Sequence, residues 1–319
     1  MLSALLREHY GITDDLALLY SHFGTEIFRC GQYIVKTLPP RAGDLENEGR
    51  VTDFLLARGI PVAKLLKTNQ GAYQVRASDM KFHVQAFIEG ETPAVNTAPD
   101  WMLEKTADLL GRIHLVLDGY TPMKINFGTD FFRKSRARNA GRNYAKKLRE
   151  AKKHGDATLI SELEERVKHL KRIAAFRIDA RKLTYRNSHG DFHIGQVIVN
   201  GRGVTVIDWT TACRLPACLE VIRSYVTAAP ACASGGIDSE GLKRYIRQYA
   251  KHVPLSEYDL KMMPYVLYFQ QILCHYSPPY SNIAETYQPH FELINQIMRW
   301  LYDHAEELSS QLSKEEKHA

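Results

Sequence analysis

Residues 188–209 read SHGDFHIGQVIVNGRGVTVIDW, and this stretch carries the strongest indication of the fold. Its apolar runs predict a pair of short strands within 195–208, joined by a glycine-containing turn at 201–203. Polar side chains lie beside these runs, and such groups are costly to bury without partners. We therefore expect them to face a functional site that includes the carboxylates of Asp191 and Asp208.

Phosphoryl transfer is a chemistry that suits these residues. It needs a positioned hydroxyl and metal-held phosphates more than covalent help from the protein. Asp191 could orient the attacking hydroxyl and accept its proton. Asp208 could hold Mg²⁺, which prefers oxygen ligands, and the amide oxygen of Gln196 could be a further ligand.

The same stretch also allows a hydrolase. His189, Asp191 and His193 alternate, so on a strand they would share one face. Together with Asp208 they could chelate a metal and activate water. This alternative leaves Lys36, in the N-terminal part of the chain, without a role.

The part of the chain before Gly90 predicts a small sheet with one inserted helix. A short amphipathic helix is expected first, at 2–10, and the inserted helix at 44–58 has Asp44 near its start. Alternating apolar patterns and turn residues predict the strands. These strands are expected at 16–20, 26–30, 32–38, 72–77 and 81–88.

Beyond Gly90 the chain is expected to be mostly helical, with helices at 101–114 and 291–308. Residues 133–186 contain 18 Lys and Arg against six Asp and Glu, which predicts a solvated helical hairpin with basic outer faces. A dock for an anionic polymer or phosphorylated ligand is the alternative. RNA binding would want exposed aromatic side chains among the cations, and few aromatics are available in this segment.

The bulk composition predicts a soluble intracellular protein of 319 residues, with 45% hydrophobic residues and a net charge of +6. This charge is too small to indicate nucleic acid as a partner. The chain has neither a signal-peptide pattern nor an apolar run long enough to span a membrane. Five scattered cysteines without a CxxC pair favour neither a disulfide framework nor a zinc site, which fits the cytoplasm.

The motifs together resemble the aminoglycoside phosphotransferase and choline kinase superfamily. Residues 189–193 and Gln196, followed by Ile207-Asp208-Trp209, are similar to the superfamily pattern HGDxHxxN and IDW or IDF. Leu110–His114 is similar to its LxxLH helix, and Phe87–Glu91 to the segment that leaves its hinge. The resemblance covers nearly the whole chain in order.

This resemblance implies an α+β, two-lobed protein-kinase-like fold, in which a small antiparallel sheet with one helix precedes a mostly helical lobe. The expected nucleotide-binding lobe is 1–89 and the helical lobe is 90–319. The helical lobe would hold the catalytic loop at 188–209 and a basic helical insertion at about 130–186.

The implied activity is ATP-dependent transfer of a phosphoryl group to a hydroxyl of a small molecule, with Mg²⁺, or alternatively Mn²⁺, as the metal. Glu48 would pair with Lys36, and Glu46 competes for that role. No nucleic acid or membrane partner is implied, and the oligomeric state stays open. The implied site comprises Asp191 as base, Lys36, Glu48, Gln85 and Phe87 on the nucleotide, and Gln196 and Asp208 on the metal.

Two features depart from the superfamily pattern. Gln196 stands where the superfamily has asparagine, and the phosphate-covering turn Ser21–Thr25 has a single glycine. The most similar branch is the spore-coat-associated and uncharacterised one, which adds spore association to the cytoplasm as an expected location. A non-catalytic kinase-like binding or spore-coat protein therefore remains the alternative function.

Overall fold

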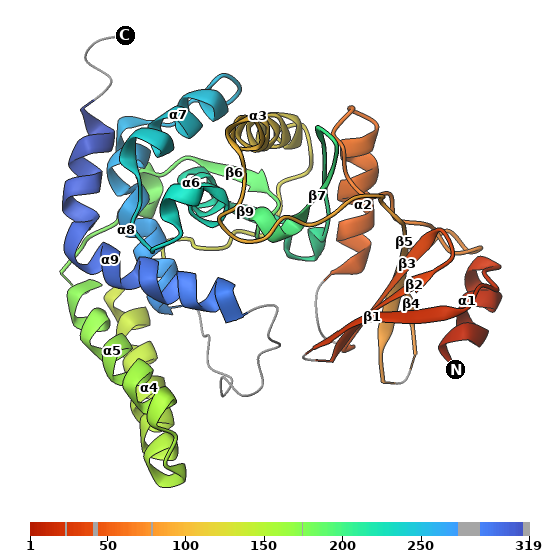
Figure 1. Ribbon diagram of the computed structural model, residues 1–319, viewed down its shortest axis with the longest axis horizontal. Helices are drawn as coiled ribbons and strands as arrows, with labels where there is room; N and C mark the ends of the chain where they lie inside the picture. The colour runs from red at the N-terminus through yellow and green to blue at the C-terminus, as the bar shows by residue number, and fades with distance from the viewer. Residues whose placement is uncertain (23, 41–43, 78, 174, 274–287, 315–319) are drawn as a thin grey trace.

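The computed structural model of the protein describes residues 1–22, 24–40, 44–77, 79–173, 175–273 and 288–314. A small sheet with its helices lies at one end of the molecule, and a larger group of helices lies at the other (Figure 1). The expected α+β, two-lobed kinase-like architecture is confirmed.

The sheet has five antiparallel strands in the order β1-β2-β3-β5-β4. Lys36 on β3 lies opposite His83 on β5. Four strands agree with the sequence prediction, whereas β4 is shorter than the expected 72–77 strand. The bounds are β1 Leu16–His22, β2 Thr25–Cys30, β3 Tyr33–Leu38, β4 Val75–Arg76 and β5 Lys81–Ala86.

The two faces of this sheet serve different purposes. Helix α1 (Leu2–Tyr10) packs Leu6 into an apolar cluster with Val35 and Val84 on one face. Because side chains alternate along a strand, Lys36 and His83 lie on the other face. Helix α2 (Leu45–Leu56) starts at Asp44, whose carboxylate accepts a hydrogen bond from the Asn47 N–H at 3.0 Å. Both helices occur where the sequence predicts them.

The remainder is mostly helical, as expected. Two small strand pairs, β6 with β9 and β7 with β8, lie among the helices and carry the loops of the site. The strands are β6 Tyr185–Ser188, β7 Val197–Asn200, β8 Gly203–Val206 and β9 Cys213–Pro216. The helices are α3 Asp100–Leu117, α4 Lys134–His154, α5 Ala157–Ile173, α6 Ala217–Ala228, α7 Ser239–Ala250, α8 Glu257–Leu273 and α9 Gln288–Ser313. Short 3₁₀ turns are η1 Ala180–Lys182, η2 Ile194–Gln196, η3 Trp209–Thr211 and η4 Pro230–Cys232.

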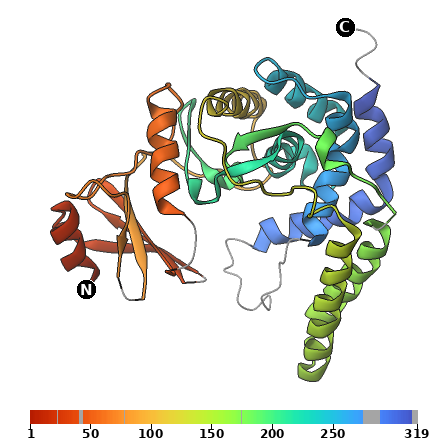
Figure 2. The ribbon, with the colours of Figure 1, turned by 180° about the vertical axis from the view of Figure 1, so that it is seen from behind.

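Helices α4 and α5 form the predicted hairpin, which projects from the body of the molecule (Figures 1 and 2). An aromatic-rich stretch of sequence runs from Tyr265 in α8 to Tyr280. Its part within α8 belongs to the core, since Tyr268 and Phe269 are buried. The rest of that stretch, from Cys274 through Tyr280, lies outside the described residues. Within the described segments, no helix is both long and apolar enough to cross a membrane.

Candidate active site

The catalytic loop begins where strand β6 ends at Ser188. Gly190 has φ 90°, and a Cβ there would collide with the backbone oxygen of Thr211, so glycine is needed at this position. The next residue, Asp191, has a side chain that is 45% exposed. Its Oδ1 lies 3.3 Å from Arg223 Nη1, and its Oδ2 lies 3.7 Å from His193 Nε2.

A fully buried carboxylate, Glu220 on α6, holds this loop from beneath. Its Oε1 accepts hydrogen bonds from the N–H groups of Gly190 at 2.8 Å and Phe192 at 3.2 Å. Its Oε2 accepts from the Ser188 hydroxyl and lies 3.0 Å from His114 Nε2. Burial alone would raise the pKa of Glu220, but the hydrogen bond and charge of His114 and the charge of Arg223 hold it well below its ordinary value.

The helix identified from Leu110–His114 therefore contributes to the site. His114 near the end of α3 is fully buried, with Nδ1 2.7 Å from the Tyr249 hydroxyl and Nε2 2.5 Å from Ser188 Oγ. Three separate helices, α3, α6 and α7, thus meet at the start of the catalytic loop through His114, Glu220 and Tyr249.

His189 connects the catalytic loop to the Ile207-Asp208-Trp209 segment. Its Nε2 lies 2.8 Å from the Ile207 carbonyl oxygen, and its ring packs against the buried Trp209. Over the described ranges, no group of three or more His, Cys, Asp or Glu side chains is arranged to hold a metal. His189 Nε2 is occupied by the Ile207 carbonyl oxygen, so this ring does not join Asp191 and His193 on the shared face that the metal-dependent hydrolase alternative requires.

Asp208 and Lys36 form an ion pair between the helical lobe and the sheet. Lys36 Nζ lies 2.7 Å from Asp208 Oδ1, and the Thr210 hydroxyl donates to the same oxygen at 2.6 Å. Burial would raise the pKa of Asp208, but the charge and hydrogen bond of Lys36 and the Thr210 bond lower it well below its usual range. Asp208 is thus an anionic oxygen donor, the type that binds Mg²⁺.

Glu48 is buried close to this ion pair, but the expected Lys36–Glu48 pair differs from what is observed. In the described part of the chain Lys36 pairs with Asp208, and Glu48 Oε1 accepts a hydrogen bond from the Trp209 N–H at 3.0 Å. Burial raises the pKa of Glu48 to about 8, against the lowering effect of the nearby Lys36 charge. Glu46, the alternative partner predicted for Lys36, instead accepts a hydrogen bond from the Tyr73 N–H at 3.1 Å.

The backbone of Gln196 lies beside Ile207, the residue before Asp208, because the Gln196 carbonyl oxygen accepts the Ile207 N–H at 3.0 Å. Its amide Nε2 lies 3.5 Å from His193 Nε2, so Oε1 is the atom of this amide left for a cation. His193 Nδ1 also accepts the Gly195 N–H at 3.1 Å, so this ring braces the loop.

Gln85 and Phe87 lie at the end of the sheet where the chain leaves for the helical lobe. Gln85 is half-buried on β5, and the Phe87 ring lies 3.2 Å from the guanidinium carbon of Arg29. The linker that follows pairs with β7 through two hydrogen bonds between Glu91 and Val199. A cavity of about 620 Å³ is lined by linker residues and the β7–β8 turn.

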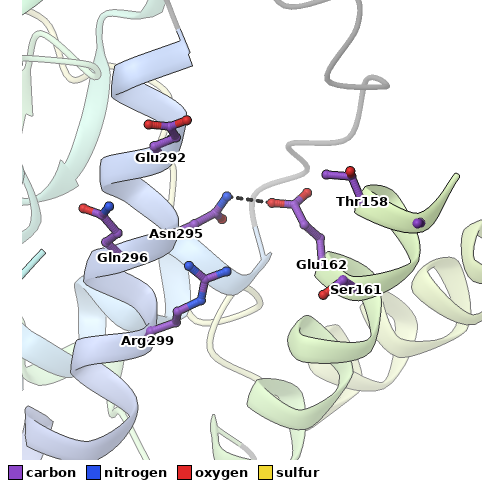
Figure 3. Close-up of a pocket in the computed structure, with 8 residues that line it drawn as sticks. Thr158, Ser161, Glu162, Glu292, Asn295, Gln296 and Arg299 are labelled. Atoms are coloured by element: carbon purple, nitrogen blue, oxygen red, sulfur yellow. Dashed lines mark hydrogen bonds between the residues drawn. The ribbon is translucent and has the colours of Figure 1, made fainter.

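A second cavity, of about 640 Å³, lies between the start of α5 and the first half of α9 (Figure 3). Polar side chains contribute to its wall, where Asn295 donates to Glu162 Oε1 at 2.7 Å. The N-terminal end of α9 also reaches the catalytic loop, since the rings of His290 and His193 lie 5.0 Å apart. The labelled lining residues are Thr158, Ser161, Glu162, Glu292, Asn295, Gln296 and Arg299.

Two residues of this site were not identified from the sequence. They are Glu220 and Arg223. Both lie in the otherwise apolar helix ACLEVIRSYVTA, three residues apart and hence on one face. The signal that could have identified them is the presence of charged side chains in a helix that is otherwise apolar and therefore expected to be buried.

The comparisons with known proteins agree with this geometry. A family model described as "Phosphotransferase enzyme family" (APH) matches residues 22–256. A search of curated proteins finds no match. Among solved structures, the amicoumacin kinase hAmiN in complex with AMP-PNP, Ca²⁺ and Ami has a TM-score of 0.63 at 12% identity, covering 96% of this chain and 92% of that chain.

Two further structures have similar folds. Spectinomycin phosphotransferase APH(9)-Ia, in complex with ADP and spectinomycin, has a TM-score of 0.54 at 14% identity, covering 97% of this chain and 98% of that one. A microcompartment-associated aminopropanol kinase has a TM-score of 0.55 at 14% identity, covering 98% of each chain.

The family model spans more than half of the chain, so this protein belongs to the phosphotransferase enzyme family. This result agrees with the resemblance to the aminoglycoside phosphotransferase and choline kinase superfamily that the sequence motifs carry. The comparisons support this superfamily and do not support the spore-coat branch.

Proposed function

We propose that the protein transfers the γ-phosphoryl group of ATP to a hydroxyl group of a small molecule, with Asp191 as the base. One observation carries this proposal. The Asp191 carboxylate is 45% exposed, while the N–H groups on either side of it are held by the fully buried Glu220. A rigid backbone thus presents a solvent-accessible carboxylate, which is what a positioned general base requires.

The two oxygens of Asp191 have different surroundings. Oδ1 faces the Arg223 guanidinium at 3.3 Å, which fixes the orientation of the carboxylate. Oδ2 has a longer separation, 3.7 Å, from His193 Nε2. Oδ2 is therefore the atom that accepts the hydroxyl proton as the hydroxyl oxygen attacks, and its orientation limits which hydroxyl can react.

The donor set near Asp208 fits a magnesium nucleotide. Asp208 and the Gln196 amide oxygen would hold Mg²⁺ or Mn²⁺, and Lys36 would turn from Asp208 to the phosphates. When bound, ATP with its metal supplies the phosphoryl group and neutralises its charge. Gln85 and Phe87 would contact the nucleotide at the linker, so residues 1–89 form the proposed nucleotide-binding lobe and 90–319 the acceptor-binding lobe.

We assign the acceptor to the cavity between α5 and α9. This cavity lies along the helix whose first turn places His290 against His193 of the catalytic loop (Figure 3). Carboxylate, amide and hydroxyl groups line it, and such a wall suits a polar molecule with several hydrogen-bonding groups.

Replacement of the base tests this function. Asp191→Asn keeps the shape of the side chain but cannot accept the proton. We expect phosphoryl transfer to fall by about 10²-fold or more, the scale of general-base loss, with ATP binding retained. ADP formation would be measured over a panel of hydroxylated metabolites, amino alcohols and sugars, and ATP binding by calorimetry.

The matched control is Asp130→Asn, at an exposed aspartate that pairs with Arg133. This variant should retain full activity. Wild-type turnover in Asp191→Asn would remove Asp191 from its role. Nucleotide binding without transfer to any acceptor would instead favour the alternative of a non-catalytic binding protein.

A further inference from the structure

The proposed mechanism does not use His83, although this residue lies at its centre. His83 on β5 is fully buried and lies directly opposite Lys36 on β3. Directly paired residues on neighbouring antiparallel strands have Cβ atoms about 4.5–5.5 Å apart on the same face. The imidazole is therefore beside the lysine that is proposed to bind the nucleotide phosphates.

His83 also faces the helix carboxylate. Its Nδ1 lies 3.4 Å from Glu48 Oε2, and the two side chains are 0% and 1% exposed. The other oxygen of Glu48 accepts the Trp209 N–H at 3.0 Å. A chain of contacts thus runs from β5 through α2 to the residue that follows Asp208.

This arrangement leaves polar atoms poorly satisfied. Within the described segments, both ring nitrogens of His83 and Oε2 of Glu48 are buried without a partner at hydrogen-bonding geometry. Such groups destabilise a fold, and an apolar side chain on β5 would avoid the cost. A costly histidine is best explained by a function, and perturbed groups beside a ligand site are often functional.

The titration behaviour of the pair supports a hydrogen bond between neutral imidazole and Glu48. Burial, reinforced by the Lys36 charge, lowers the pKa of His83 to about 3, so its ring is neutral and carries a single N–H. Nδ1 and Oε2 already face each other, so a small closing movement of the two side chains makes this bond.

We propose that His83 is a positioning residue for the nucleotide, because its Nδ1 hydrogen-bonds Glu48 and so fixes Trp209 and Asp208 relative to Lys36. The proposal rests on the proposed function of the site. With Glu48 held by His83 and the Trp209 N–H, Lys36 is released from Asp208 to the phosphates without loss of the geometry around it. Loss of the His83 bond lets the Glu48 carboxylate rotate and loosens the hold on Trp209.

Three substitutions separate this role from simple core packing. His83→Leu removes both ring nitrogens, His83→Asn places an amide near the Nδ1 position, and His83→Gln places one near the Nε2 position. The probe is Mg²⁺ with AMP-PNP, measured by calorimetry on the full chain. We expect about tenfold weaker binding in His83→Leu and His83→Gln, and binding within about twofold of wild type in His83→Asn, as expected for one hydrogen bond.

The outcomes are distinct. Equal binding by the Asn and Gln variants would overturn the role of Nδ1, and this comparison stands even where His83→Leu fails to fold. Unaltered binding in all three variants, with only a lower Tm, would make His83 a packing residue. Wild-type protein that binds no nucleotide would overturn the proposed function itself. The ¹⁵N spectrum of the ring, recorded at a pH above the Glu48 pKa of about 8, checks the contact without nucleotide, because Glu48 is then a carboxylate that can only accept. A proton on Nδ1 supports the contact, and a proton on Nε2 alone overturns it.

Discussion

Glu220 shows how a single side chain organises the catalytic loop. A carboxylate without exposure is costly unless its oxygens are satisfied, and Glu220 meets this condition by accepting two backbone N–H groups and bonding Ser188 and His114. These partners are the residues that define where Asp191 lies. The stability of the fold and the position of the proposed base therefore depend on the same group.

We expect Glu220→Gln to destabilise the protein by roughly 2–5 kcal/mol, because an amide cannot accept at both of its ends and leaves buried donors unpaired. Urea unfolding measures the change, and Glu240→Gln is the control. Glu240 lies on α7 and pairs with Lys243 near the surface, with a side chain that is 65% exposed. A loss in Glu220→Gln as small as the control's would show that the loop does not depend on this carboxylate.

Glu48 should make stability fall as the pH rises, which is the opposite of the effect of a carboxylate whose pKa is lowered on folding. Its pKa is raised from 4.5 to about 8 by burial, so the folded state holds a proton that the unfolded state has lost. The contribution of Glu48 to the free energy of unfolding is fully present below about pH 4.5 and is lost as the pH rises through about 8. Glu48→Gln should flatten the fall in unfolding free energy between these values.

Urea unfolding at a series of pH values checks this expectation. Glu46→Gln, at the glutamate that competes with Glu48 on the same helix turn, should keep the wild-type slope. An unchanged slope in Glu48→Gln would mean that Glu48 is ionised in the folded protein, with its charge fully compensated by Lys36 and the Trp209 N–H.

The sequence was informative at the residue scale where function imposes a local spacing. Asp191, Gln196 and Asp208 could be selected because they lie in one short stretch, and the structure places them near one another through His189 and Ile207. Glu220 and His83 could not be selected in this way. Their importance comes from what packs against them, which a single sequence does not state.

At the scale of elements, the α4–α5 hairpin combines two kinds of charged residue. Most cations of α4 are exposed, as the predicted solvated face requires. Arg166 on α5 is 2% exposed and donates to the Gln271 carbonyl oxygen at 2.9 Å and to Asn295 Oδ1 at 3.0 Å. One arginine therefore attaches the hairpin to α8 and α9, beside the proposed acceptor cavity.

We expect Arg166→Gln to cost roughly 2–5 kcal/mol, because the shorter side chain leaves buried acceptors on α8 and α9 without their charged donor. The matched control is Arg138→Gln on the exposed face of α4, which should change stability by less than about 0.5 kcal/mol. Urea unfolding compares the two. Equal losses of stability in the two variants would contradict the distinction between Arg166, which attaches the hairpin, and Arg138, which is solvated.

The excess of Lys and Arg in residues 133–186 predicted the hairpin but not its attachment. Charge content indicates a solvated helical pair, whereas the choice of which of 18 cations is buried depends on partners more than 100 residues away in sequence. The short β4 has a similar cause. The Tyr73 N–H bonds Glu46 of α2, so the segment before Val75 turns towards that helix and does not extend the sheet, despite its strand-like pattern.

At the scale of the molecule, two neighbouring residues of the helical lobe contact the N-terminal lobe at the proposed site. Asp208 pairs with Lys36 of β3, and the Trp209 N–H bonds Glu48 of α2. Asp208 itself has φ 61°, a left-handed conformation that is uncommon for a residue with a side chain. The segment proposed to bind the metal thus also contacts the N-terminal lobe, so under the proposed function we expect nucleotide binding and the arrangement of the lobes to be coupled.

A double-mutant cycle tests this coupling. In the absence of nucleotide, Lys36→Met and Asp208→Asn should show a coupling of about 1–3 kcal/mol in unfolding free energy, as for partly buried groups in direct contact. The control cycle pairs Lys36→Met with Glu48→Gln and should give a smaller value, because Lys36 makes its ion pair with Asp208. Saturating Mg²⁺ with AMP-PNP should reduce the first coupling, since Lys36 and Asp208 then have separate partners on the nucleotide and the metal. A larger coupling for Lys36 with Glu48 would show that α2 holds the lysine before nucleotide binds. The proposed movement of Lys36 from Asp208 to the phosphates would then be wrong.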